Sequence, residues 1–311
     1  MIYLNGKKVE FIEFPNKERR LDLPANMVNI DLYQIVNNVY WKYEDDKSIF
    51  ELLALDYAIK TYCEQYNLYI GYMPYSRMDR VEKEGTAFSL DIITNILTKN
   101  LSSVNHIFIL DPHSDITLNL LNNKQKYKKT VAYEFEESNT PNKKYEFAKD
   151  VINYTKLDIN NAWFIFPDKG AAKRYNADDY PNVIICEKVR DFATGKIQQI
   201  KAHIEKQTTS PEKDAPIIII DDLCSYGGTF VGAIKAIEND LKIKSKNNWL
   251  IITHAEEAMM EANIPNTFNK VFSTDSIATS SGAISISSQE FDENHHFYIR
   301  PVLDIIEELN K

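Results

Sequence analysis

Residues 215–230, with the sequence APIIIIDDLCSYGGTF, decide the fold. The four consecutive isoleucines at 217–220 are typical of a strand that is buried on both faces of a parallel sheet. Two adjacent carboxylates, Asp221 and Asp222, follow the isoleucines, and a turn of small residues follows the carboxylates. From Phe230 to Leu241, apolar residues recur at helical spacing. The stretch therefore predicts a strand, an acid pair, a glycine turn and a helix, in that order.

The glycine turn and the acid pair together predict a site for a phosphorylated sugar. Backbone N–H groups at a helix N-terminus bind anions, most often phosphate. Gly227 and Gly228 allow a close approach because they have no Cβ. Asp221 and Asp222 can accept hydrogen bonds from two vicinal hydroxyls, and a phosphate beside a diol describes a ribose 5-phosphate unit. The alternative is a buried strand that is followed by a solvated acidic turn with no ligand.

The composition restricts the class of protein. A chain of 311 residues predicts one large or two medium domains, and 44% hydrophobic residues suffice for a core. The net charge of −9 argues against non-specific binding to nucleic acid or to an anionic membrane. Because no apolar run reaches the ~18 residues that span a bilayer and the N-terminus has no signal-peptide pattern, we expect a cytoplasmic protein.

The three cysteines, Cys63, Cys186 and Cys224, have no spacing typical of a metal site. This fits a reducing compartment without structural disulfides. Cys224 lies in the predicted phosphate loop. Since no partner base is evident in the sequence, we interpret it as a small loop residue rather than a nucleophile.

Apolar runs alternate with helical patterns along the rest of the chain, which predicts a parallel α/β architecture. We expect helices at residues 48–66, 88–101 and 302–309, and strands at 68–73, 106–110, 162–166, 183–186, 217–220, 249–253 and 271–273. Ligands bind beyond the carboxyl ends of such strands. The residues that follow six of them are Arg77 and Asp79, Asp111 and His113, Asp168, Lys188 and Arg190, Asp221 and Asp222, and His254. Each alone could be a solvated turn residue, but the set predicts the lining of a polyphosphate site.

Six motifs occur in the order known from one enzyme family. They are GYMPYSRMDR (71–80), ILDPHSD (109–115), FPDKGAAKRY (166–175), EKVRDFATGKI (187–197), IIIIDDLCSYGGTF (217–230) and ITHAEEA (252–258). With these motifs the chain resembles the ribose-phosphate diphosphokinases, also called phosphoribosyl diphosphate synthetases. The resemblance implies an α/β fold with two phosphoribosyltransferase-like domains, each a parallel sheet flanked by helices. We expect them at residues 1–145 and 146–290, with a C-terminal helix in 291–311 that returns to the first domain.

The resemblance also implies the reaction and the partners. The family transfers the β,γ-diphosphate of ATP to the 1-hydroxyl of a 5-phosphoribose with Mg²⁺, and it releases AMP. The active site lies between the domains and takes residues from a neighbouring subunit, so we expect a homo-oligomer, either a dimer or a hexamer. Neither nucleic acid nor a membrane is expected as a partner.

The resemblance also implies roles for individual residues of this chain. By resemblance, Arg77 and Asp79 would contact ATP, and Phe14, Asn16 and Glu18 would contact its adenine. His113 and Asp168 match the positions linked to Mg²⁺, and His113, Lys188 and Arg190 match catalytic positions. The ribose-phosphate site would comprise Asp221, Asp222, Cys224, Ser225, Tyr226, Gly227, Gly228 and Thr229.

The chain departs from the family in the phosphate loop, where SYGGT replaces the usual DTGGT. Ser225 replaces an acid and Tyr226 replaces a small threonine. Two acceptors therefore stay open: ribose 5-phosphate, for nucleotide biosynthesis, and ADP-ribose, which a similar phage-borne subgroup uses in NAD salvage. Tyr226 would stack on an adenine in the second case, or else pack against the following helix.

Two further departures affect the first half of the chain. FPNKE (14–18) replaces the FxDGE-type turn of the family, so the resemblance supports Asn16 as an adenine contact less strongly. The segment VEKEGTAFSL (81–90) is less basic than its family counterpart, which weakens the case for regulation by phosphate and ADP. Two other function classes compete with the diphosphokinase: a non-catalytic regulatory homologue and a phosphoribosyltransferase. The retained charged residues argue against the first, and the ATP-type residues of the first half argue against the second.

Overall fold

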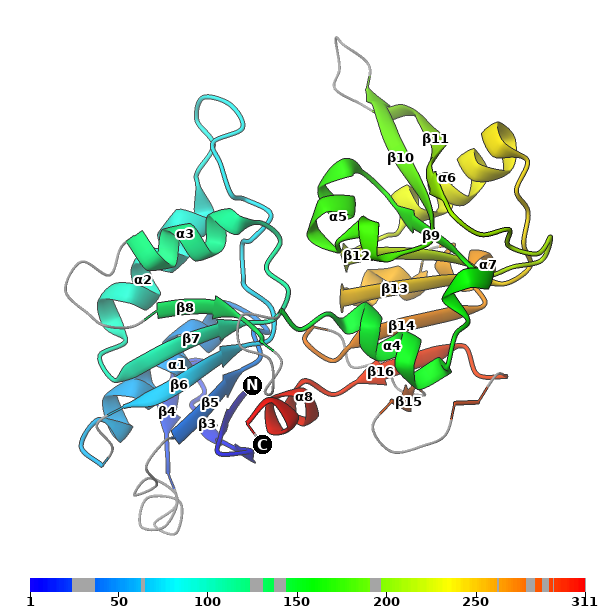
Figure 1. Cartoon of the computed structure of the whole chain (residues 1–311). Coiled ribbons are helices and arrows are strands. Elements are labelled where there is room, and N and C mark those ends of the chain that lie inside the picture. The colour runs from blue at the N-terminus through cyan, green and yellow to red at the C-terminus, as the bar shows by residue number, and fades with distance from the viewer. Residues whose placement is uncertain are drawn as a thin grey trace. The chain divides into compact units, whose positions relative to one another are not determined.

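The structure is a computed structural model of the chain. It describes residues 1–23, 37–62, 65–123, 131–136, 144–190, 197–261, 263–277, 283–286, 291–292 and 294–310. The chain divides into two compact units (Figure 1), Met1–Tyr145 with Val302–Lys311, and Glu146–Pro301. Each unit has its own sheet with flanking helices, which confirms the predicted α/β fold class. Cys63 lies outside the described residues.

The first unit contains a six-stranded sheet of order β2-β1-β5-β6-β7-β8 and a separate hairpin of β3 and β4. The strands are β1 (Ile2–Leu4), β2 (Lys7–Lys8), β3 (Phe11–Glu13), β4 (Arg19–Leu21), β5 (Asn37–Trp41), β6 (Tyr66–Ile70), β7 (Val104–Ile109) and β8 (Val131–Glu134). The helices are α1 (Lys47–Ile59), α2 (Ser89–Asn100), α3 (Asp115–Asn123) and α8 (Val302–Leu309). Strands β5 to β8 are parallel, whereas β1 and β2 are antiparallel additions at one edge.

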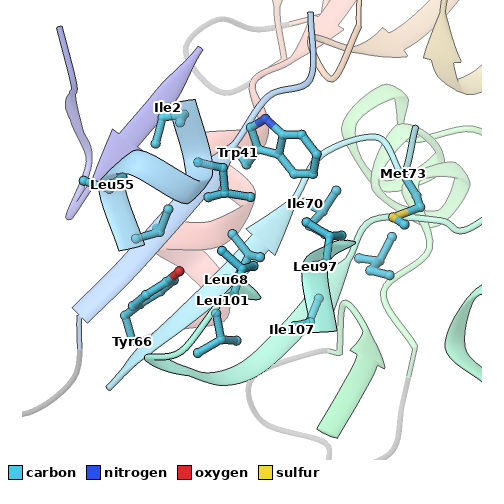
Figure 2. Packing of buried hydrophobic residues seen from close by; sticks show 14 of the residues in the cluster. Ile2, Trp41, Leu55, Tyr66, Leu68, Ile70, Met73, Leu97, Leu101 and Ile107 are labelled. Atoms are coloured by element: carbon cyan, nitrogen blue, oxygen red, sulfur yellow. The ribbon is translucent and has the colours of Figure 1, made fainter. Parts of the chain in front are cut away.

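Helices α1, α2 and α3 all cover one face of this sheet. Consecutive parallel strands are neighbours here, so right-handed crossovers place every connecting helix on the same side. One apolar cluster accordingly joins Leu55 of α1 and Leu97 of α2 to Leu68 and Ile107 of the sheet (Figure 2). Helix α8 packs on the other face, where the Tyr69 hydroxyl donates to Asn310 Oδ1 at 2.9 Å.

The second unit contains an eight-stranded sheet of order β11-β10-β9-β12-β13-β14-β16-β15. The strands are β9 (Trp163–Phe166), β10 (Asn182–Arg190), β11 (Ile197–Gln207), β12 (Ile217–Cys224), β13 (Asn248–Ala255), β14 (Lys270–Thr274), β15 (Ile284–Ser285) and β16 (Phe297–Arg300). The helices are α4 (Phe147–Thr155), α5 (Lys169–Arg174), α6 (Gly228–Ala236) and α7 (Ile264–Thr267). All pairs are parallel except β10 with β11, which form a long antiparallel hairpin (Figure 1).

The winding of the second sheet reverses between β9 and β12. The chain passes from β9 through α5 to β10 on one side, and from β12 through α6 to β13 on the other. Right-handed crossovers in opposite directions place α5 and α6 on opposite faces of the sheet. Such a reversal leaves a crevice at the carboxyl ends of the two strands, and ligands bind there in open α/β sheets.

Several predicted boundaries are wrong. The helix expected at 48–66 ends at Ile59, because Tyr66 begins β6 with a buried hydroxyl that donates to Asp56 Oδ1 at 3.1 Å. The terminal helix begins at Val302, as expected, and the residues just before it form β16 in the second unit. Among the described residues, no helix combines the length and apolar character that a bilayer crossing requires.

Candidate active site

The acid pair lies inside β12 rather than after it. The strand pairs with β13 as far as Cys224 and Ala255, so both carboxylates belong to the last part of the strand. The sequence could not show this, because strand pairing uses backbone groups and continues beneath polar side chains. The backbone N–H of Asp222 donates to Asp221 Oδ1 at 3.0 Å.

Charge is distributed unequally over the acid pair. Burial, reinforced by the neighbouring Asp222 carboxylate, raises the pKa of Asp221 well above its ordinary value. Asp222 is 4% exposed, and its Oδ1 lies 2.6 Å from Nη1 of Arg174 at the end of α5. The pair is therefore one carboxylate beside a cation and one carboxyl group that resists ionisation.

The turn after the acids has the geometry that its glycines predict. Gly227 has φ of +71° and caps α6, and a Cβ there would lie 2.3 Å from Ile264 Cδ1, so only glycine fits. A Cβ at Gly228 would meet open space. Ser225 and Thr229 are half-buried, whereas the Tyr226 side chain is 69% exposed at the rim of the loop. The N-terminus of α6 thus faces a small-residue loop with one projecting aromatic ring.

The Cys224 thiol belongs to the core. Its side chain is 1% exposed and packs in the same apolar cluster as Phe230 and Ile219. Burial, with contributions from nearby carboxylates, raises the pKa of Cys224 to about 12. A thiol with this pKa stays protonated at neutral pH and is a poor nucleophile.

Two ion pairs and a capping hydrogen bond gather at the start of helix α5 in the second unit. Asp168 caps the helix by accepting from the Ala171 N–H at 3.0 Å, and its Oδ2 lies 3.4 Å from Lys188 Nζ on β10. The next residue, Lys169, pairs with Glu187 at 3.1 Å. The structure therefore brings together Asp168 and Lys188, which the sequence predicts as metal-linked and catalytic residues.

Lys188 and Arg190 do not follow a strand, as the sequence had predicted, but lie within β10. The strand runs on to Arg190 because β11 pairs with it, with Lys188 opposite Ile200. The alternating residues of β11 give only a weak pattern, so the hairpin was not expected. The side chain of Arg190 and residues 191–196 lie outside the described part of the structure.

In the first unit the loops after β6 and β7 meet at Asp79. This residue is 4% exposed, and its carboxylate accepts from Arg80 Nε at 2.7 Å and from Ser114 Oγ at 3.0 Å. Burial alone would raise the pKa of Asp79, but these hydrogen bonds and the charge of His113 outweigh it and lower the pKa. Arg77 is exposed on the same loop, as a nucleotide contact requires.

Tyr75, which the sequence did not single out, anchors the loop that carries Arg77. Its backbone φ is +62°, a strained value for a bulky residue. The Tyr75 hydroxyl donates to Asp46 Oδ1 at 2.5 Å, and the Tyr43 hydroxyl donates to the same oxygen at 2.8 Å. No sequence signal marks this contact, since Asp46 and Tyr75 meet only through the tertiary fold.

The three predicted adenine contacts lie on the turn between β3 and β4. Phe14, Asn16 and Glu18 are all exposed. The Glu18 N–H donates to Asn16 Oδ1 at 3.2 Å, and the Arg20 guanidinium lies 5.8 Å from the centroid of the Phe14 ring. The turn therefore presents an aromatic ring and polar groups to solvent.

His254 does not line the site, contrary to the prediction from its place after a strand. Strand β13 continues to Ala255, and His254 is 2% exposed, with Nδ1 2.8 Å from Ser276 Oγ. His113 and Asp168, which the resemblance links to Mg²⁺, belong to different units. Among the residues that the structure describes, no group of three or more His, Cys, Asp and Glu side chains forms a metal centre.

Comparisons with known proteins agree with this description. No family model matches the chain. A ribose-phosphate pyrophosphokinase from Sulfurisphaera tokodaii is 28% identical over 74% of this chain and 71% of its own. One from Thermococcus kodakarensis is 26% identical over 90% of this chain and 89% of its own.

A solved structure extends the similarity to the fold. The phosphoribosylpyrophosphate synthetase from Mycobacterium smegmatis aligns with a TM-score of 0.64, at 14% identity, over 97% of this chain and 89% of its own. Its fold matches both units, and the relatives align over most of their length and of this chain. The chain is therefore similar, over most of its length, to ribose-phosphate pyrophosphokinases, the phosphoribosyl diphosphate synthetases.

Proposed function

We propose that the protein is an ATP-dependent diphosphokinase that transfers the β,γ-diphosphate of ATP to the 1-hydroxyl of a 5-phosphoribosyl acceptor. One observation carries the proposal: an acid pair and a glycine turn at a helix N-terminus lie at the point where the second sheet reverses its winding. This arrangement suits a sugar diol and its phosphate. Relatives named ribose-phosphate pyrophosphokinase support the same reaction.

The step forms a bond between the acceptor's 1-oxygen and the β-phosphorus, and it breaks the bond between that phosphorus and the oxygen that leaves with AMP. The hydroxyl proton is released. Such a transfer needs positioning and charge stabilisation more than covalent help. We assign the ammonium of Lys188 to the charge on the transferred diphosphate, and Arg77 and Asp79 to the ATP side. We also propose that His113 and Arg190 contribute to catalysis, and this proposal rests on the family resemblance alone.

Mg²⁺ fits the carboxylates that are present. This ion keeps several waters and uses one or two carboxylates together with substrate phosphates, so it needs no cluster of protein ligands. Asp168 offers a carboxylate that is 49% exposed, and His113 is half-buried in the other unit. When bound, Mg²⁺ neutralises phosphate charge.

A second acceptor, ADP-ribose, is favoured by Tyr226. A side chain that is 69% exposed does not pack against the following helix, so the ring is accessible to a ligand. Stacking of a nucleic-acid base on an aromatic ring contributes ~1–3 kcal/mol. Ser225, which replaces an acid, removes repulsion against a longer anionic chain. ADP-ribose as the acceptor would fit a role in NAD salvage.

Product analysis tests the reaction class. Purified protein is incubated with ATP, Mg²⁺ and either ribose 5-phosphate or ADP-ribose, and products are identified by mass spectrometry. We expect AMP together with an acceptor that has gained a diphosphate. ADP with a monophosphorylated acceptor would identify an ordinary kinase, and no turnover with either acceptor would favour a regulatory homologue. The same protein run on a sizing column tests the proposed homo-oligomer.

A further inference from the structure

Arg174 is a charged residue of the second unit that the sequence did not assign to the site, yet it contacts the acid pair directly. It is the last residue of α5, and its Nη1 lies 2.6 Å from Asp222 Oδ1. The carboxylate side chain is 6% exposed and the guanidinium side chain 19%. A contact this close and this buried fixes both groups, because either one alone would be left as an uncompensated charge.

The position of Arg174 on α5 ties two parts of the site together. Asp168 caps the first turn of this helix and contacts Lys188, and Arg174 contacts Asp222 at the other end. Six helical residues span about 9 Å, and a single short helix holds its ends at a fixed separation. A cation in the last turn is also favourable with respect to the helix dipole.

We infer that Arg174 is a positioning residue that orients the Asp222 carboxylate toward the ribose hydroxyls of the acceptor. The inference rests on the proposed function. The ion pair between Nη1 and Oδ1 restrains the carboxylate, whose two oxygens offer further lone pairs to hydroxyl donors. The guanidinium charge also compensates that of the Asp222 carboxylate.

Kinetics of Arg174 variants test this role. With the acceptor that the wild type uses, Arg174→Met is expected to raise the KM for acceptor by about 10–30-fold while the KM for ATP and kcat change by less than about threefold. Arg174→Lys keeps the charge without the planar fork and is expected to recover most of the loss. Lys173→Met, an exposed neighbour on the same helix, is the matched control and should leave all three constants unchanged.

Different outcomes separate the possible errors. In an Asp222→Asn background, Arg174→Met should add less than about twofold, because both changes remove the same contact. An undiminished second effect, or a folded Arg174→Met variant with an unchanged KM for acceptor, would overturn the role of Arg174 alone. If the methionine variant does not fold by circular dichroism, Arg174→Gln takes its place in both measurements. A wild-type protein that releases no AMP with ribose 5-phosphate or ADP-ribose would overturn the proposed function, and this role with it.

Discussion

The two units treat a carboxylate at the carboxyl edge of a sheet in opposite ways. In the first unit Asp79 stands alone between Arg80 and Ser114, and its pKa is lowered. In the second unit Asp221 lies beside Asp222, and its pKa is raised by burial and by that neighbour. The first arrangement is electrically complete before any ligand binds. In the second, Arg174 compensates the charge of Asp222, and the remaining carboxyl oxygens can accept hydrogen bonds from a ligand that brings hydroxyl donors.

The winding of the two sheets explains this difference. The first sheet winds in one direction, so Ser114 from the loop after β7 reaches Asp79, whose charge Arg80 of the same loop neutralises. The second sheet reverses between β9 and β12, and Asp221 and Asp222 lie in the last part of β12, on the edge where ligands bind in open α/β sheets. We propose that the acceptor binds at the second unit, and four predictions test this proposal.

The largest expected effect is at Lys188. Lys188→Ala should lower turnover ~100-fold or more while the fold survives, because transition-state charge stabilisation worth ~3 kcal/mol is lost. Initial rates of AMP release measure it. Lys201→Ala, an exposed lysine on the other strand of the same hairpin, is the control and should retain wild-type turnover. A near-normal rate for Lys188→Ala would remove Lys188 from the catalytic residues.

The second prediction is that an acid in each unit affects the KM of a different substrate. Asp222→Asn should raise the KM for acceptor ~30-fold, about 2 kcal/mol, since it weakens hydrogen bonds to a charged acceptor group. The KM for ATP should change little. Asp79→Asn should raise the KM for ATP, by a smaller factor, and leave the KM for acceptor nearly unchanged. Steady-state kinetics with each substrate varied in turn decide the matter, and equal losses for both substrates in Asp222→Asn would assign the acid pair to the nucleotide side.

The third effect concerns the loop rim. Ser225→Asp with Tyr226→Thr should shift preference from ADP-ribose toward ribose 5-phosphate by roughly tenfold, because one stacking contact is worth ~1–3 kcal/mol. Competition between the two acceptors in one reaction gives the ratio directly. The idea fails if the wild-type protein uses ribose 5-phosphate well and ADP-ribose not at all.

The smallest effect is on stability and has opposite signs in the two units. The pKa of Asp79 is lowered in the fold, so its contribution is present above the unfolded pKa of about 3.9 and is lost as the pH falls through the folded pKa. The pKa of Asp221 is raised, so its cost is absent below that unfolded pKa and grows as the pH rises through the folded pKa.

Thermal unfolding of asparagine variants measures whether each carboxylate raises or lowers the stability of the fold. At pH 7, Asp221→Asn should raise Tm and Asp79→Asn should lower it, each by about 2–4 °C per ~1 kcal/mol for a domain of this size. Both differences should shrink in acid, where the wild-type carboxylates are protonated. Shifts of the same sign at pH 7 would contradict the assignment of the two pKa directions.

The sequence predicted the elements that have strong local patterns. Helices α2 and α8 and strand β9 lie within one residue of their expected limits, because apolar periodicity and local burial agree there. It failed where pairing overrides side-chain polarity, as in β10, which continues through Glu187 and Lys188 because β11 hydrogen-bonds to it. It also took His254 for a strand-end ligand, although the strand continues and buries it.

The same limit applies to the site. The acid pair and glycine turn are contiguous, so their chemistry can be read from the chain. Arg174 is separated from Asp222 by the hairpin of β10 and β11 and the first part of β12, and Tyr75 is separated from Asp46 by a helix and a strand. Only the packed sheets place these partners at 2.6 and 2.5 Å.

The glycine turn determines where this loop can tolerate change in evolution. Any side chain at Gly227 would collide with Ile264, whereas the position of Gly228 opens to free space and Tyr226 already projects outward. Selection on a new acceptor can therefore act through positions 225, 226 and 228 but not through 227. In a saturation library that is selected for activity, variants at position 227 should be lost first. The substitutions that remain at positions 225, 226 and 228 would show which acceptors this loop can accommodate.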